Sequence, residues 1–217
     1  MDKSNVPELH AIWDEARSHI ESGNYDKAIE IYRYVLVRYS DNDVAAEHAN
    51  AYLSDIFLTL RQLDPAEAHI SKAISLKPEK PGYRYILGFI YSVKRQWDKA
   101  IPEFEIAVDK EPDNGEYLRG LAWAIYSGGD RARGLASLEE ASRLAPTNVN
   151  ILTDLAVAHL SSVNINKAAE YAERAVRLDP ANALAQDVLK NVLSFDKKLK
   201  QRGKEASKAQ DNNSGTF

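Results

Sequence analysis

Histidine is the residue of this sequence with the most ways to do chemistry, because it can bind a metal, transfer a proton or activate a nucleophile. The chain has five: His10, His19, His48, His69 and His159. His19 and His159 share a column that faces the interior of a helix pair, so we expect hydrogen-bonded core histidines there. His10 and His48 share another column, but packed helices lie roughly 8 to 10 Å apart, too far to share a metal at bonds of about 2 Å. The sequence therefore predicts no metal site.

The other reactive groups are not arranged for catalysis. Glu139 and Glu140 are adjacent, so on a helix their carboxylates point to different sides and we expect solvated surface. Gly128-Gly129-Asp130 lacks the preceding strand and the following Gly-Lys-Ser/Thr of a phosphate loop, and we interpret it as a turn between helices. No serine has a recognisable base partner, and the absence of cysteine excludes a disulfide framework or a thiolate zinc site. We expect no enzymatic activity and no cofactor.

Charge and hydropathy narrow the class of partner. The 217 residues carry a net charge of −4. From Asp196 onward six basic residues face three acidic ones, which gives that segment +3 and leaves −7 for the rest. An acidic body argues against nucleic acid as a ligand. The basic tail either solvates the end of the chain or contacts an acidic partner or a membrane surface.

Neither a secretory signal nor a membrane span is expected from the sequence. The first seven residues lack the apolar run of a secretory signal. No uncharged apolar stretch approaches the roughly 18 to 20 residues that cross a bilayer. We therefore expect a soluble cytoplasmic protein.

The elements that must position these residues repeat with a fixed period. Pro78, Pro112, Pro146 and Pro180 lie 34 residues apart, and Asn114, Asn148 and Asn182 can cap the helices that follow. Such a period marks a stacked repeat array. We predict an N-terminal arm (1–8), five repeats (about 9–42, 47–80, 81–114, 115–148 and 149–182), a capping helix (183–202) and a disordered basic and polar tail (203–217).

The first repeat and its connection to the second are irregular. Ala28 and Ala66 are 38 residues apart where later equivalents are 34 apart. Four extra residues therefore lie between these repeats, about one helical turn if they are helical. We predict that Asp26 caps the second helix of repeat one. Asp64-Pro65-Ala66-Glu67 is predicted to open the second helix of repeat two, with a cap, a proline in the first turn and a glutamate that reaches back.

Small residues occupy two columns that are predicted to face each other. They are Ala16, Ser54, Gly88, Ala122 and Ala156 in first helices, and Ala28, Ala66, Ala100, Gly134 and Ala168 in second helices. Small side chains let two helix backbones approach closely, while larger neighbours fill the space around the contact.

These positions resemble a known repeat family. Within residues 81–114, the side chains Leu87, Gly88, Tyr91, Ala100, Phe104, Ala107 and Pro112 match the tetratricopeptide repeat. The resemblance covers about residues 9–182. It implies an all-α fold, an α-solenoid of antiparallel helix pairs stacked into a right-handed superhelix, whose concave face is lined by the first helix of each pair. It also implies a non-catalytic adaptor or scaffold that receives a peptide or a helix in that groove.

Mapped by this resemblance, the groove has an aromatic centre with few charges. The partner-binding candidates are Trp13, Arg17, Asp55, Tyr85, Phe89, Arg119, Trp123, Tyr126 and Val157. Aromatic residues flanked by arginine are common energetic anchors of interfaces. For Tyr85, Phe89, Trp123 and Tyr126 three roles stay open: contact with a ligand, packing between repeats, and cover by the chain's own tail.

The same columns bear on the kind of ligand. One subgroup of the family binds chaperone C-terminal carboxylates through a clamp of lysines, asparagines and an arginine. Here the corresponding columns hold Trp13, Arg17, Tyr52, Tyr85 and Phe89, so we expect an apolar or amphipathic protein segment, extended or helical. An adaptor is the favoured function.

Two alternatives to the adaptor remain. The first is a self-associating scaffold, a homo-oligomer in which the irregular first repeat or the apolar closing helix docks on another copy. The second is a regulatory or targeting domain whose basic tail contacts a membrane.

Overall fold

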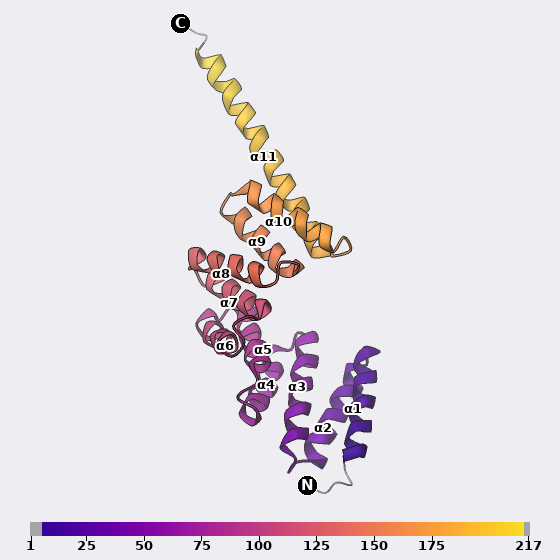
Figure 1. Ribbon diagram of the computed structural model, residues 1–217. Helices are drawn as coiled ribbons and strands as arrows, with labels where there is room; N and C mark the ends of the chain where they lie inside the picture. The colour runs from indigo at the N-terminus through magenta and orange to yellow at the C-terminus, as the bar shows by residue number, and fades with distance from the viewer. Residues whose placement is uncertain (1–5, 215–217) are drawn as a thin grey trace. The chain divides into compact units, whose positions relative to one another are not determined.

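The computed structural model describes the backbone of residues 6–214 and the side chains of residues 8–203 and 205. The described residues form eleven α-helices joined by short turns and contain no strand (Figure 1). The fold class is therefore all-α, a solenoid of antiparallel helix pairs, as predicted. The chain divides into two compact units, residues Met1–Glu111 and Pro112–Phe217, and each has its own packing.

The N-terminal unit holds three helix pairs. They are α1 (Val6–Glu21) with α2 (Tyr25–Arg38), α3 (Asp43–Thr59) with α4 (Leu63–Leu76), and α5 (Pro81–Val93) with α6 (Trp97–Lys110). Within the unit α2 also packs on α3, and α4 on α5. A continuous hydrophobic core runs from Leu9 in α1 to Ile90 in α5.

The C-terminal unit holds two pairs and a final long helix. They are α7 (Gly115–Ser127) with α8 (Arg131–Leu144), α9 (Val149–Ser161) with α10 (Ile165–Leu178), and α11 (Ala183–Ser214). Helix α11 packs against α10 and α9, which it covers as the predicted capping helix would.

The four extra residues before repeat two form a helical turn. Helix α3 has 17 residues, whereas α5, α7 and α9 have 13 each. Asn42 caps the longer helix, because its side-chain oxygen accepts a hydrogen bond from the Ala45 amide at 3.1 Å. Ala45 is fully buried, so the added turn contributes to the core.

The small-residue columns lie where the two helices of each pair approach most closely. Their alanines and Ser54 are fully buried, and Ser54 Oγ donates to the Ala66 carbonyl of the facing helix at 3.0 Å. A Cβ atom added to Gly88 would lie 2.9 Å from the Phe104 ring, and one added to Gly134 would lie 2.5 Å from the Tyr126 amide nitrogen. The predicted columns are thus confirmed.

Predicted caps at the starts of first helices are confirmed. The Asn114 side chain accepts from the Glu116 and Tyr117 amides, Asn148 from the Asn150 and Ile151 amides, and Asn182 from the Ala185 amide. These asparagines satisfy amides that have no partner within the helix.

Both predicted caps of second helices are wrong. Asn24 caps α2 by accepting from the Lys27 amide, and Asp26 lies in the first turn. Helix α4 begins at Leu63, and its Gln62 cap makes no side-chain hydrogen bond. Asp64 instead pairs with Lys94, the residue that follows α5, at 2.5 Å between carboxylate oxygen and Nζ. In α2 the earlier of the two capping-type residues is therefore the cap, and α4 begins without a side-chain cap.

The turn inside each pair contains one residue with a left-handed backbone. Gly23 and Gly129 have positive φ angles, and Arg61, Arg95 and Val163 take φ = 57° at the equivalent positions. Glycine adopts this conformation without steric cost, whereas a side chain costs roughly 1 to 2 kcal/mol. Three of the five turns therefore retain local strain, most clearly at the β-branched Val163.

The two chain ends differ from the predicted arm and tail. Helix α1 begins at Val6, and most of the predicted arm at 1–8 lies outside the described residues. Helix α11 continues to Ser214, although the sequence predicted a disordered tail from Gly203. The segment has no proline and begins with good helix formers, and one exposed glycine costs only about 1 kcal/mol. Residues 215–217 lie outside the described residues.

Candidate partner-binding faces

Helices α1 and α3 are joined by a row of contacting aromatic rings. The Trp13 ring centroid lies 5.2 Å from that of His10 and 4.2 Å from that of His48. The His48 centroid lies 4.7 Å from Tyr52, which stacks on the buried Tyr32 at 5.3 Å. Trp13 is half-buried, so this candidate both packs between repeats and keeps part of its surface exposed.

Two nitrogens of this row are buried without hydrogen-bond partners. They are Trp13 Nε1 and His48 Nδ1. Burial lowers the pKa of His48, and the cations Lys80, Arg17 and His10 act in the same direction against the opposing charge of Glu47. His48 is therefore held in its neutral form at neutral pH.

The charged candidates of the N-terminal unit are exposed. Arg17 pairs with Asp14 of its own helix at 3.1 Å, an exposed ion pair that contributes little to stability. Asp55 is exposed on α3. Both charges are accessible on the first-helix side of the unit.

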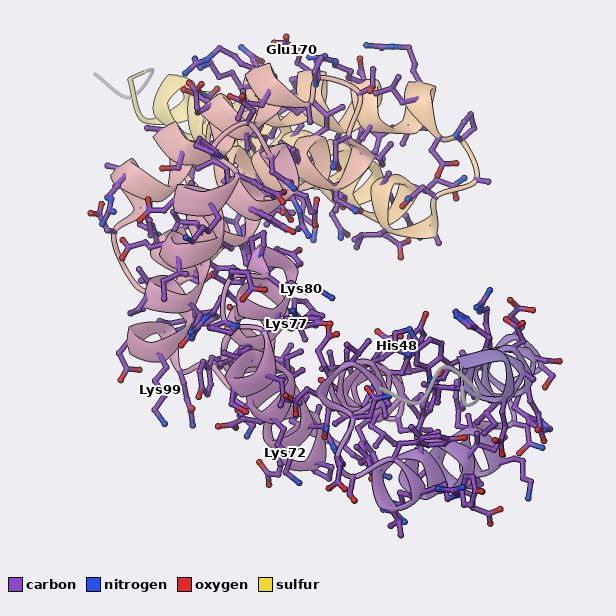
Figure 2. The ribbon with its side chains drawn as sticks, turned by 60° about the horizontal axis from the view of Figure 1, so that its bottom comes forward. His48, Lys72, Lys77, Lys80, Lys99 and Glu170 are labelled. Carbon is purple, nitrogen blue, oxygen red and sulfur yellow. The ribbon has the colours of Figure 1, made fainter. Side chains whose placement is uncertain are left out.

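A buried carboxylate ties α3 to the start of α5, and sequence reasoning missed it. Glu47 accepts a hydrogen bond at 2.6 Å from Nζ of Lys80, a residue labelled in Figure 2, and another from the Tyr83 hydroxyl. Burial alone would raise the Glu47 pKa, but these two donors outweigh it and lower that pKa. The signal was faint, because only the Lys80 and Tyr83 spacing of three residues places both donors on one side of a helix.

Helix α5 presents its two candidate aromatics differently. The Tyr85 ring packs at a tilt against Phe104, with 5.5 Å between centroids, and is half-buried. Phe89 lies one turn later and is 44% exposed. Phe89 is thus the candidate whose apolar surface is most open.

In the C-terminal unit Arg119 is held by the protein's own carboxylates. Its Nε lies 3.0 Å from both Glu116 oxygens, and its Nη1 lies 2.8 Å from Asp154 Oδ2 on α9. Burial works against the charge, yet these carboxylates raise the Arg119 pKa well above its usual value. The guanidinium therefore joins α7 to α9, a role the sequence did not predict.

Tyr126 lies in the packing between repeats, one of the roles left open for it. It is 8% exposed, and its hydroxyl donates to the Ala158 carbonyl at 3.2 Å. Trp123 stacks on it with 5.7 Å between ring centroids and stays partly exposed. Val157 is half-buried against the cluster formed by α9, α10 and α11.

The histidines are placed mostly for packing. His159 is buried and stacks on Tyr171, but its Nε2 has no hydrogen-bond partner, contrary to prediction; Glu139 Oε1 lies 3.9 Å away. His69 does make a hydrogen bond, with its Nδ1 2.8 Å from Asn50 Oδ1.

Among the described residues no group of three or more His, Cys, Asp or Glu side chains is placed to hold a metal ion. No described helix is both long and apolar enough to cross a membrane.

Comparison with solved structures shows the same fold at low identity. TTC0263, a thermophilic TPR protein in Thermus thermophilus, gives a TM-score of 0.70 at 17% identity, over 85% of this chain and 98% of that one. MamA 41-end from Desulfovibrio magneticus RS-1 gives 0.67 at 15%, over 81% and 97%. YrrB, described as a TPR protein with an unusual peptide-binding site, gives 0.59 at 19%, over 81% and 88%.

Sequence comparison identifies the family. A search of curated proteins found no match. The tetratricopeptide repeat model matches residues 14–83, 91–148 and 126–183, which together cover well over half of the sequence. This fold indicates a protein-protein interaction or scaffold role, and proteins of this kind are generally non-catalytic. The chain belongs to the tetratricopeptide repeat family.

Proposed function

We propose that this chain is a non-catalytic adaptor that binds a peptide or a helix of another protein on the first-helix faces of its repeats. The observation that carries the proposal is Phe89, a large aromatic side chain left 44% exposed on α5 at a position the repeat packing does not require. Burying such a ring against a ligand supplies affinity at interfaces. That the structurally similar YrrB is described with a peptide-binding site is compatible with this role.

The charges of the N-terminal unit suggest the polarity of the ligand. Asp55 is the residue of α3 equivalent to Phe89 of α5, 34 positions earlier, and it is exposed. Neighbouring packed helices lie about 8 to 10 Å apart, within reach of one short segment. Because both residues occupy the same column of consecutive first helices, we expect the segment bound there to combine an apolar side chain for Phe89 with a lysine or arginine for Asp55.

The C-terminal unit offers a separate contact at Trp123. The Trp123 ring stacks on Tyr126, and the Tyr126 hydroxyl donates a hydrogen bond to the Ala158 carbonyl. A ring supported in this way loses little conformational freedom on binding, which favours an anchor role. Arg119 is engaged by Glu116 and Asp154, so we assign it the task of positioning α7 rather than contacting the ligand.

The test begins with the full chain as bait to isolate a partner and map its binding segment as a peptide. Calorimetric titration of that peptide should show a loss of about 2 kcal/mol or more for Phe89→Ala, the size expected of an anchor. Tyr34→Ala is the matched control, because Tyr34 is also an exposed aromatic but lies on the second helix α2. Unchanged affinity in both Phe89→Ala and Trp123→Ala would reject the first-helix faces as the site.

A further inference from the structure

Helix α11 carries an apolar stripe of which only the first half is covered. Ala185, Val188 and Val192 are buried against α9 and α10. Phe195 and Leu199 continue the same spacing of three and four residues, but they are 37% and 38% exposed. The C-terminal part of α11 runs on beyond α9 and α10 (Figure 1). The stripe therefore extends past the helices that cover its first half.

This spacing is that of a coiled-coil seam, in which first and fourth heptad positions face a partner helix. The next seam positions are 202, 206 and 209, where the sequence has arginine, alanine and alanine. Lys197 and Lys200 fall outside the seam. Apart from Arg202, the pattern thus separates a narrow apolar seam from an outer face that carries Lys197 and Lys200.

The uncovered part of α11 needs packing to be stable as a helix. Nineteen residues, 196–214, follow Phe195 in this helix. Helices of this length are marginal in water unless an apolar face is packed, and this one contains the poor helix formers Gly203, Asn212 and Asn213. A partner on the Phe195 and Leu199 seam would supply that packing.

We propose that a second copy of this chain covers the seam, with the two α11 helices packed antiparallel. In the alignment that sets Leu199 level with Arg202 of the second copy, the aliphatic stem of the arginine can cover the leucine while its charge reaches water. Phe195 is then level with position 206 of the second copy, where the sequence has alanine. The two-fold axis makes each of these contacts twice.

Charges beside the seam select the antiparallel arrangement. Lys198 and Glu205 both occupy the same flanking heptad position and are exposed. The antiparallel alignment brings Lys198 of one copy next to Glu205 of the other, giving two opposite-charge pairs. A parallel pair would instead set Lys198 opposite Gly203 and Arg202 opposite Arg202, which gives repulsion and no ion pair.

A lipid surface is the other possible cover for the seam, but two large apolar side chains are too few to hold the helix in it.

This association is independent of the proposed adaptor function, because it uses no residue of the first-helix faces. Light scattering of the full chain at rising concentration should show the mass increase from one chain towards two. Leu199→Asp should weaken the association roughly tenfold or more, since it places a charge in the seam. Leu193→Asp is the matched control, because Leu193 is 51% exposed on the other side of the same helix. A monomer at every concentration, or equal effects of both variants, would overturn the proposal.

The orientation can be read by crosslinking, because the chain has no cysteine of its own. The single variants Leu199→Cys and Arg202→Cys should form a disulfide with each other when mixed, faster than either does alone. Faster pairing within each single variant would refute the antiparallel alignment. Sedimentation with phosphatidylserine vesicles tests the other source of cover: a chain that stays monomeric and binds the vesicles through α11 has a lipid ligand, which also overturns the proposal.

Discussion

Gly134 offers a sharp test of how closely the two helices of a repeat must approach. In a helix interior, glycine to alanine usually adds stability, by about 1 kcal/mol. At Gly134 the added Cβ would lie 2.5 Å from the amide nitrogen of Tyr126 and 2.6 Å from its Cα and Cβ. These are backbone or near-backbone atoms, which cannot rotate aside, so α7 and α8 must move apart.

The net effect follows from two opposing magnitudes. Overpacking a close contact costs about 1 to 3 kcal/mol, and the gain in helix propensity offsets about 1 kcal/mol of it. Because the clash is with backbone, we take the upper part of the range and expect Gly134→Ala to lower the free energy of unfolding by about 1 to 2 kcal/mol. Tyr126 stacks on Trp123, so the fluorescence of Trp123 should also change.

Urea denaturation followed by circular dichroism measures the loss, and Gly203→Ala is the matched control. Gly203 is also helical, but nothing lies within 4 Å of its added Cβ, so that variant should be as stable as the wild type or slightly more so. If Gly134→Ala had the same denaturation midpoint as the wild type, a small residue at this position would not be needed for the close approach of α7 and α8.

Three further outcomes can be measured by the same denaturation assay. Arg119→Ala should lower the free energy of unfolding by roughly 2 to 4 kcal/mol, because it leaves two largely buried carboxylates without their cation. A loss no larger than that of an exposed arginine would contradict this. Val163→Gly should raise the free energy of unfolding by about 0.5 to 1 kcal/mol, because glycine takes the left-handed backbone of this exposed position without strain. No gain in stability would mean that the turn is unstrained. Stability should fall as the pH drops through about 6.5, because burial lowers the pKa of folded His48, His69 and His159 while the unfolded chain takes up the protons. His48→Gln should remove the His48 share and make the dependence shallower, and an equally steep dependence would refute this.

The repeat period explains what could be predicted from the sequence. From the second repeat onward the small-residue columns recur every 34 residues, as do the caps Asn114, Asn148 and Asn182, so several copies of a weak local signal support one another. The cap column of the second helices varies in residue type, which weakens that support; it holds Asn24, Gln62, Gln96, Asp130 and Asn164. Asn24 and Asp26 are both capping residue types only two positions apart, and local preference alone could not choose between them.

Side-chain roles on the first-helix faces could not be predicted in the same way. The position within a repeat predicts the face on which a side chain lies, but not the residues that it contacts there. Arg119 occupies a ligand-facing column, yet Glu116 one turn before it and Asp154 in the next repeat hold its guanidinium. Tyr126 shares the same face and is buried by its contacts with α9. Phe89, Asp55 and Arg17 are the candidates that remain exposed. Arg119 is engaged by the chain's own carboxylates, whereas Asp55 in the column of Phe89 is exposed, so we expect the segment bound at Phe89 to carry a positive charge beside its apolar anchor.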